Sequence, residues 1–357
     1  MAPLIRRLRE TKGFEIRLCN TGQHRELLDP ILRFFKLEIN YSLKIMTEGQ
    51  GLQQLTSSVI LKTQPVFEDF HPDLVLVHGD TTTSFATSLS AFYAGIQVAH
   101  VEAGLRTYQK HAPFPEEINR HLTAILADIH FSPTRTAADN LRREGITNNV
   151  FVTGNTVIDA LFDALTLLDE NDVEIQALKR QVDFSKKIIL FTGHRRENFG
   201  KGFEEIFSAL QSITNNREDV VIIYPVHPNP RVKAVAEKYF LNSDKIILVE
   251  PLGYGPFIWL MQKAYIILTD SGGIQEEAPS LGKPILVLRE VTERPEAVLA
   301  GTVTLVGTNQ QKIIEITNRL LDDSVFYSQM TGIHNPYGDG KASERIIGHL
   351  KALSIAH

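Results

Sequence analysis

Cysteine is nearly absent from this sequence, because only Cys19 occurs among the 357 residues. A single thiol excludes an internal disulfide and a metal site built from several thiolates. Disulfide-rich chains belong to oxidising compartments, so the shortage of cysteine favours an intracellular, cytoplasmic protein. Cys19 itself stands at the end of a strand-like segment and is expected to be a buried strand residue.

Long hydrophobic runs are absent as well. The apolar segments at 187–191 and 265–268 fall far short of the ~20 residues needed to span a bilayer. The first ten residues, MAPLIRRLRE, carry arginines where a secretion signal needs an apolar stretch. We therefore expect a protein that neither crosses a membrane nor is exported.

Basic residues are in the minority, since 37 Lys and Arg face 42 Asp and Glu and the formal net charge is -5. Without a basic surplus to hold a polyphosphate backbone, nucleic acid is not expected as a partner. The share of hydrophobic residues, 43%, is that of a globular protein. A prior of about 150 residues per domain predicts two domains for this length.

Three common nucleotide and metal motifs are also missing. The chain has no G-x-G-x-x-G fingerprint, no G-x-x-x-x-G-K-[ST] loop and no Asp-x-Asp pair that would hold a metal on a sugar diphosphate. A bound nucleotide diphosphate would then be held by backbone N–H groups, Arg and His, with neither a metal nor a cofactor.

What the sequence does contain is a regular alternation of short β-rich runs and amphipathic segments. This pattern predicts an α/β protein built from two doubly wound, Rossmann-like domains with parallel sheets. The predicted strands lie at 15–19, 74–78, 97–101, 129–131, 150–153, 187–191, 220–226, 245–248, 265–269, 285–288 and 303–305.

The polar, helix-prone stretch at 159–185 separates the two sets of strands and is the predicted linker. We place an N-terminal domain at 1–165 and a C-terminal, nucleotide-binding domain at 166–336. A turn-rich break at 335–340 precedes a last amphipathic segment, so 337–357 forms a separate C-terminal helix.

The beginning of the chain departs from the usual pattern. A doubly wound domain opens with a strand in the middle of its sheet, whereas this chain opens in a helical pattern with Leu4, Ile5 and Leu8 on one face. We therefore expect the first strand of the N-terminal domain to be missing from this sequence.

Carboxylates follow two neighbouring strands of the first half, where open α/β sheets bind ligands. Asp80 comes just after the strand at 74–78, and Glu102 comes just after the strand at 97–101. Asp80 alone is also compatible with a helix N-cap. Glu116 begins a further helix, where a carboxylate also stabilises the positive end of the helix dipole.

Histidines and arginines follow strands of the second half. His194 stands with two arginines after the strand at 187–191, which favours an anion-binding corner over a core histidine. His227 occupies the equivalent place after the strand at 220–226, where a loop residue held by prolines is an equal alternative.

The most specific segment is TDSGGIQEEAP at 269–279, in which a strand ends, two glycines follow and a helix begins. Free N–H groups there would face an anion such as a diphosphate. Either Glu276 or Glu277 could accept both ribose hydroxyls, and Arg294 after the next strand is suited to phosphate.

These motifs occur together in one known family. VHGDTTTSFATSLSAFY, HVEAGLRT, FPEEINR, TGNTVIDAL, TGHRRENFGKGF, YPVHPNP and TDSGGIQEEAPSLGKP, in this order and spacing, resemble the bacterial non-hydrolysing UDP-N-acetylglucosamine 2-epimerases. The resemblance runs from Met1 to about Leu350. It implies the two-domain B-type glycosyltransferase fold, a last helix that crosses back to the first domain, and a homodimer formed through first-domain helices.

Carried over motif by motif, the resemblance also implies roles for single residues. The implied catalytic residues are Asp80, Glu102, Glu116 and His194, and the implied substrate contacts are Phe257 at the uracil, Ser271, Gly272 and Gly273 at the phosphates, with Glu277 and Arg294 completing the nucleotide site.

Some members of the family bind a second, activating substrate molecule, through residues matched here by Gln23, Arg195 and His227. Gly49 stands where that site has an arginine, and Leu252 stands where relatives have a glutamine at the uracil. Family members also precede the first helix with a strand and a G-T-R-P-E turn, which this sequence lacks.

The implied reaction interconverts UDP-N-acetylglucosamine and UDP-N-acetylmannosamine by loss of UDP to a glycal and its re-addition. Carbon 2 carries no acidic proton, so the reaction needs an anion clamp for departing UDP together with carboxylates that act as acid and base. Two alternatives stay open: a glycosyltransferase that uses a UDP-sugar, and an inactive UDP-sugar-binding form.

Overall fold

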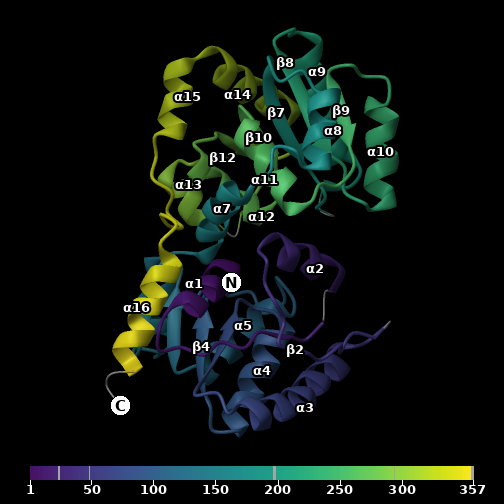
Figure 1. The fold of residues 1–357 in the computed structure, drawn as a ribbon. Helices are drawn as coiled ribbons and strands as arrows, with labels where there is room; N and C mark the ends of the chain where they lie inside the picture. Colours follow the sequence, from purple (N-terminus) through teal and green to yellow (C-terminus); the bar gives the residue numbers. More distant parts are fainter. Residues whose placement is uncertain (23–24, 48, 196–197, 293, 355–357) are drawn as a thin grey trace. The chain divides into compact units, whose positions relative to one another are not determined.

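The structure, a computed structural model, describes residues 1–22, 25–47, 49–195, 198–292 and 294–354. The chain divides into two compact units (Figure 1). The first unit combines Met1–Asp163 with Tyr337–His357, and the second unit is the continuous stretch Ala164–Pro336. No helix within the described ranges is long and apolar enough to cross a membrane.

Helices and short parallel strands alternate in the first unit. Its elements are α1 (Ala2–Glu10), β1 (Cys19–Asn20), α2 (Arg25–Phe34), β2 (Tyr41–Ser42), α3 (Leu52–Phe70), β3 (Leu74–His78), α4 (Thr82–Tyr93), β4 (Gln97–Val101), α5 (Glu116–Leu126), β5 (Ile129–Ser132), α6 (Arg135–Arg143), β6 (Val150–Val152), α7 (Thr156–Leu167), which runs past the division, and α16 (Ala342–Ser354).

The strands of the first unit form two separate sheets. Four parallel strands lie in the order β3-β4-β5-β6, and β1 pairs in parallel with β2 alone. Strands β3 to β6 confirm four predicted strands. Their apolar runs made them predictable, because parallel sheets are covered on both faces. The predicted strand at 15–19 is shorter and later in the structure, at Cys19–Asn20, and β2 was not predicted at all.

A cavity of about 390 Å³ separates the two sheets of the first unit. Its walls include Leu18 and Cys19 at the start of β1 and Leu74 and Leu76 of β3, with further apolar residues from α1 and α3. Leu74 and Leu76 are only half-buried, whereas the middle of the neighbouring strand β4 is fully buried. In a doubly wound sheet a strand would occupy the position between β1 and β3.

The last helix of the chain belongs to the core of the first unit. Leu4 of α1 and Ile346 of α16 share one buried cluster with Val101 and Phe131 of the sheet. Figure 1 shows α16, in yellow, beside α1, in purple. Asp159 fixes the start of α16, because its carboxylate accepts the N–H groups of Ala342 and Ser343 at 3.1 and 2.8 Å.

The second unit is a complete doubly wound domain. Its elements are α8 (Val173–Gln181), β7 (Lys187–Thr192), α9 (Lys201–Asn215), β8 (Val220–Pro225), α10 (Pro230–Phe240), β9 (Ile246–Val249), α11 (Tyr254–Lys263), β10 (Ile266–Thr269), α12 (Gly272–Glu277), the 3-10 helix η2 (Ala278–Leu281), β11 (Ile285–Val287), α13 (Pro295–Ala300), β12 (Val303–Leu305), α14 (Gln310–Asp322) and α15 (Ser324–Thr331).

Six parallel strands of the second unit lie in the order β9-β8-β7-β10-β11-β12. The first strand of this set, β7, therefore lies between β8 and β10, and the direction of strand addition reverses between β7 and β10. Ligands of open α/β sheets bind beyond the carboxyl ends of the strands at such a reversal. The fold itself therefore points to the residues that follow Thr192 and Thr269.

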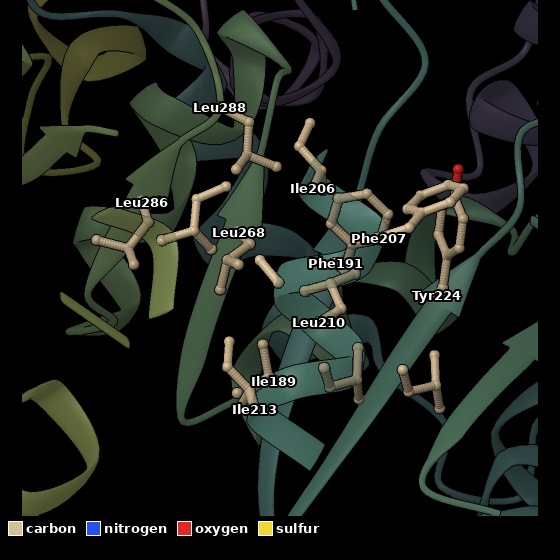
Figure 2. Packing of buried hydrophobic residues seen from close by; sticks show 14 of the residues in the cluster. Ile189, Phe191, Ile206, Phe207, Leu210, Ile213, Tyr224, Leu268, Leu286 and Leu288 are labelled. Atoms are coloured by element: carbon tan, nitrogen blue, oxygen red, sulfur yellow. The ribbon is translucent and has the colours of Figure 1, made fainter. Parts of the chain in front are cut away.

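One large apolar cluster holds helix α9 against this sheet. Figure 2 shows the rings of Phe191, Phe207 and Tyr224 next to one another, with Leu268 and Leu286 from the neighbouring strands. The ring centroids of Phe191 and Tyr224 are 4.4 Å apart. This packing fixes the end of β7, from which the predicted anion-binding loop continues.

Candidate functional site

Asp80 lies in the turn between β3 and α4, with its carboxylate 2.8 Å from Arg120 Nη2. The alternative that Asp80 caps α4 is wrong, because the N-cap is Thr81, whose hydroxyl oxygen accepts the Ser84 N–H at 3.2 Å. The carboxylate of Asp80 is thus directed to an ion pair instead of to the helix. Its side chain remains 29% exposed, which leaves it accessible to a ligand.

Glu102 follows β4 at the same edge of the sheet, because His78 at the end of β3 is in register with Val101. Its backbone is left-handed, with φ 66°. The tight turn continues at Gly104, with φ +89°, where an added Cβ would lie 2.1 Å from the carbonyl oxygen of Ala137. Strained backbone of this kind persists where the surroundings fix it, and here it aims the Glu102 side chain.

Arg120 of α5 joins the two carboxylates. Its Nη2 lies 2.7 Å from Glu102 Oε1 and 2.8 Å from Asp80 Oδ2, and its Nη1 donates to the Glu102 carbonyl at 2.9 Å. The Arg120 side chain is only 9% exposed. The sequence argument missed this residue, although it stands four positions after Glu116, one helical turn away on the same side of α5.

Glu116 and Glu117 begin α5 and differ in their surroundings. Glu116 is partly exposed, and the structure leaves both of its predicted roles possible. Glu117 is buried and accepts the N–H groups of Thr107 and Tyr108 at 3.0 and 2.8 Å. Burial alone would raise the pKa of Glu117, but these backbone hydrogen bonds outweigh it and lower the pKa. Glu117 therefore serves the loop before α5.

Two histidines belong to the strands that precede the carboxylates, His78 to β3 and His100 to β4. His78 Nε2 lies 3.7 Å from Glu102 Oε2, and burial lowers the pKa of His78 to about 4 although Glu102 opposes the shift. Burial also lowers the pKa of His100 to about 3. His100 Nε2 donates to the carbonyl of Gly79 at 2.8 Å, because a carbonyl can only accept. Both rings are neutral at physiological pH and support the turn after β3.

In the second unit, His194 and Asp270 follow β7 and β10, whose last residues Thr192 and Thr269 are in register. His194 Nδ1 lies 3.4 Å from Asp270 Oδ1, and its side chain is 37% exposed. Burial lowers the pKa of His194, while the charge of Asp270 opposes this shift. His194 is therefore a surface-accessible group at the strand reversal, and Asp270 is a partner that the sequence argument missed.

The three residues predicted for a second substrate molecule are placed as follows. The ring of His227 stacks on that of His194, with centroids 5.3 Å apart and planes at 17°. Arg195 directly follows His194 and donates its backbone N–H to Asp270 Oδ2 at 2.8 Å. Gln23 lies outside the described residues. The regulatory site thus stays a prediction, with two of its residues next to His194.

Ser271, Gly272 and Gly273 lie where β10 gives way to α12, as the sequence predicts for a phosphate-binding turn. Ser271 is the N-cap residue, and its N–H donates to Thr269 Oγ1 at 3.0 Å. At Gly273 an added Cβ would meet no atom within 4 Å, so its backbone borders open space. A ligand can approach the backbone closely at this point.

The two glutamates of α12, either of which could accept the ribose hydroxyls, differ in their surroundings. Glu276 is buried and forms an ion pair with Arg294. Glu277 is less buried than Glu276 but still partly buried, and this burial together with the like charge of Glu276 raises its pKa to about 8. Glu277 is therefore the accessible member. The role of Arg294 at the nucleotide stays a prediction, and its guanidinium donates to the carboxylate of Glu276.

Phe257 lies in α11 and is partly buried. The loop that precedes this helix, which contains Leu252, is held by Glu174 through a 2.7 Å hydrogen bond from the Gly253 N–H. The predicted uracil contacts are thus on an anchored helix start. Within the described ranges, no group of three or more His, Cys, Asp or Glu side chains is placed to hold a metal ion.

Comparison with known proteins fits this arrangement. Residues 6–351 match the family model described as UDP-N-acetylglucosamine 2-epimerase. The chain is 53% identical to the UDP-N-acetylglucosamine 2-epimerase of Escherichia coli (strain K12) over 360 residues, which cover all of this chain and 96% of that protein.

Two solved structures are similar as well. The UDP-GlcNAc 2-epimerase of Neisseria meningitidis bound to UDP-GlcNAc matches with a TM-score of 0.89 and 47% identity, over 99% of this chain and 96% of that one. The Methanocaldococcus jannaschii enzyme in complex with UDP-GlcNAc and UDP matches with a TM-score of 0.79 and 35% identity, over 98% and 95%. The chain therefore belongs to the UDP-N-acetylglucosamine 2-epimerase family.

Proposed function

We propose that this protein inverts carbon 2 of UDP-N-acetylglucosamine reversibly to give UDP-N-acetylmannosamine. The observation that carries the proposal is the pair of carboxylates at one sheet edge, Asp80 and Glu102, joined by the buried guanidinium of Arg120. Acid and base groups held this closely are needed for a proton to leave one face of a carbon and return to the other. Two structural relatives hold UDP-GlcNAc, one of them together with UDP, and this supports UDP-N-acetylglucosamine as the proposed substrate.

The chemistry requires more than a base. Carbon 2 carries an amide nitrogen and lies beside no carbonyl, so its proton is not acidic in the ground state. When the bond from the anomeric carbon to UDP breaks, positive charge develops on that carbon and acidifies the neighbouring C–H. Removal of the proton gives a glycal, and re-addition of UDP with protonation from the other face completes the inversion. No net oxidation occurs, so no redox cofactor is required.

The two units carry the two kinds of group that this route needs. In the first unit, Asp80, Glu102 and Glu116 are the proposed proton-transfer residues. In the second unit, His194 and the Ser271–Gly273 turn are proposed to stabilise the departing diphosphate, which develops negative charge as the bond breaks. We assign Glu277 to the ribose and Phe257 to the uracil on the basis of the family motif, together with Arg294 at the phosphates.

Incubation with UDP-N-acetylglucosamine in heavy water, followed by proton NMR, tests the proposal. We expect the manno epimer to appear and the carbon 2 hydrogen of both epimers to be replaced by deuterium. Formation of the epimer with its original hydrogen would contradict the carboxylate mechanism. A glycosyltransferase would leave carbon 2 unchanged and transfer the sugar to an acceptor, and a non-catalytic binding protein would leave the substrate unaltered.

We further propose that the protein forms a homodimer through helices of the first unit. We also propose that it works in the cytoplasm. Neighbouring helices α3, α4 and α5 expose the large apolar side chains Leu61, Phe92, Tyr93 and Ile125. Apolar side chains gathered on neighbouring helices are typical of a protein interface.

Analytical ultracentrifugation tests the dimer. We expect Ile125→Asp to shift the protein towards monomer at micromolar concentration, because a carboxylate would have to be buried in the interface. Leu241→Asp is the matched control, since Leu241 is an equally exposed leucine in the second unit. Dissociation by both variants, or by neither, would rule out this face as the interface.

A further inference from the structure

Asp270 is completely buried, and all of its hydrogen bonds from the described residues go to one carboxylate oxygen. Its Oδ2 accepts the backbone N–H groups of His194 and Arg195 at 2.9 and 2.8 Å and the side-chain amide of Asn198 at 3.3 Å. Three N–H donors around one carboxylate oxygen fix the orientation of the whole group. The second oxygen, Oδ1, is consequently directed at the imidazole of His194.

Oδ1 accepts no hydrogen bond from the described residues, and it faces His194 Nδ1 at 3.4 Å. An oxygen with no donor is costly in a buried position, so a slight approach of the imidazole would stabilise both groups. A carboxylate offers only acceptors, which means that the favourable partner is an Nδ1 that carries its proton. The geometry therefore selects one tautomer of His194.

The loop that carries His194 is also held from its other side. The Tyr224 hydroxyl donates to the carbonyl of Gly193 at 2.9 Å. An added Cβ at Gly193 would lie 2.8 Å from the Phe191 ring, so only glycine fits there. The His227 ring covers one face of the His194 ring. The backbone and the ring plane of His194 are thus both fixed by contacts within the protein, as is typical of preorganised groups.

We infer that Asp270 is a positioning residue for the proposed epimerisation: it keeps the proton of His194 on Nδ1, so that Nε2 is left open to take a second proton from solvent. The imidazolium formed in this way donates its Nε2–H to the departing diphosphate, and the carboxylate of Asp270 balances its charge. The same division of roles between a buried Asp and a His occurs in serine hydrolases. This inference rests on the proposed function only for its catalytic part, because the tautomer is a property of the free protein.

Asp270→Asn tests the inference. The amide oxygen of Asn can still accept the two backbone N–H groups, while its NH₂ group is turned towards Nδ1 and requires that nitrogen to accept. We expect long-range ¹⁵N–¹H NMR of histidine-labelled protein to show protonated Nδ1 in the unmodified chain and protonated Nε2 in the variant. His194→Gln identifies the His194 signal by its loss. The kcat for epimerisation should fall about 100-fold or more.

Asn198→Ala is the matched control, because it removes a donor from the same carboxylate without changing the atom that faces His194. We expect its His194 tautomer to equal that of the unmodified chain and its kcat to fall less than about 10-fold. An Nε2–H tautomer in the unmodified chain overturns the inference by itself. An unchanged tautomer or a near-normal kcat in Asp270→Asn also overturns it. If the unmodified chain does not epimerise at all, the proposed function fails while the NMR result still decides the placement of the proton.

Discussion

Arg120 illustrates what a single side chain contributes to the candidate site. Two carboxylates at adjacent strand ends would repel one another, and the guanidinium between Asp80 and Glu102 cancels that repulsion while leaving both available as acceptors. The proposed epimerisation needs one carboxylate as base and one as acid. Which carboxylate holds a proton then depends on whether the bound substrate displaces the Arg120 guanidinium or shares it with them. Asp80 and His194 are the clearest residues to remove, since one is proposed for proton transfer and the other for the anion site.

Asp80→Asn and His194→Ala are each expected to lower kcat by roughly 100-fold or more, as the loss of a positioned acid or base or of an anion contact should. Both side chains are partly exposed, so we expect the melting temperature to change little. Steady-state kinetics with UDP-N-acetylglucosamine and calorimetry of the same preparations provide the measurement. Near-normal turnover in either variant would remove that residue from the mechanism.

Glu277 has a consequence for the dependence of stability on pH. Its pKa is raised by burial and by Glu276 from about 4.5 to about 8, so the folded protein keeps this proton in a range where the unfolded chain has lost it. The free energy of unfolding should therefore fall as the pH rises through that window. In Glu277→Gln the group no longer titrates, and the fall should be smaller.

Urea unfolding at several pH values between about 4.5 and about 8 measures this slope. Glu237→Gln, at an exposed glutamate of the same unit, should retain the slope of the unmodified protein. Equal slopes for Glu277→Gln and Glu237→Gln would show that Glu277 is ionised in the folded state and that the predicted shift is wrong.

The residues of the site were predictable from the sequence only as single positions. Asp80, Glu102 and His194 stand out because they follow apolar runs, and strand ends are where such folds bind ligands. Arg120 and Asp270 do not stand out in this way, because their importance arises from the side chains they meet in three dimensions. Asp270 lies inside the recognised segment at 269–279, but only the register of β7 with β10 shows that it faces His194.

At the scale of elements, the apolar runs locate most strands, whereas short polar strands escape. The runs behind β7, β8 and β10 are continuous because parallel strands in this sheet are buried on both faces. The two-residue strand β2, Tyr41–Ser42, has no apolar run, and the prediction overlooked the alternation of apolar and polar residues at 39–45 that surrounds it. Its pairing with β1 is set by tertiary structure, which no local pattern reports.

The cap of α16 gives a prediction at this scale. Asp159 of α7 accepts two N–H groups at the start of a helix 183 and 184 positions away in the sequence. Asp159→Ala should destabilise the first unit by about 1 to 2 kcal/mol, the usual value for a lost N-cap. It should also speed hydrogen exchange in the first turn of α16, because the N–H groups of Ala342 and Ser343 lose the carboxylate that accepts them.

Asp172→Ala removes the N-cap of α8 in the second unit and is the matched control. Hydrogen exchange with mass spectrometry should show faster exchange in α8 and an unchanged α16 for this variant. If α16 exchanges at the same rate in Asp159→Ala and in the unmodified chain, hydrophobic packing against α1 alone holds the helix.

For the molecule as a whole, the two units differ in how complete their sheets are. The six strands of the second unit are continuous, while the sheet of the first unit is divided by the apolar cavity beside β3. An apolar cavity next to a half-buried strand edge forfeits both packing and backbone hydrogen bonds. The first unit should therefore be the less stable of the two.

An added strand should repair this division. We expect an apolar extended segment, followed by a G-T-R-P-E turn and fused ahead of Met1, to raise the melting temperature by about 5 °C or more, since each kcal/mol of stability is worth a few degrees. The cationic side chain of the turn should also raise turnover. An extension of equal length made of Gly and Ser is the control. If both extensions leave melting temperature and turnover unchanged, the cavity receives no strand and the division costs little.

The first unit is built from two distant stretches of chain, and this determines when its folding can be completed. Synthesis proceeds from the N-terminus towards the C-terminus, so all of the second unit emerges from the ribosome before α16 does. Until then, Leu4 and Phe131 lack the apolar partners that α16 provides. The later half of the sequence can thus mature first, and the earlier half waits for its last helix with apolar surface exposed, at the stage where a nascent chain most needs protection by chaperones.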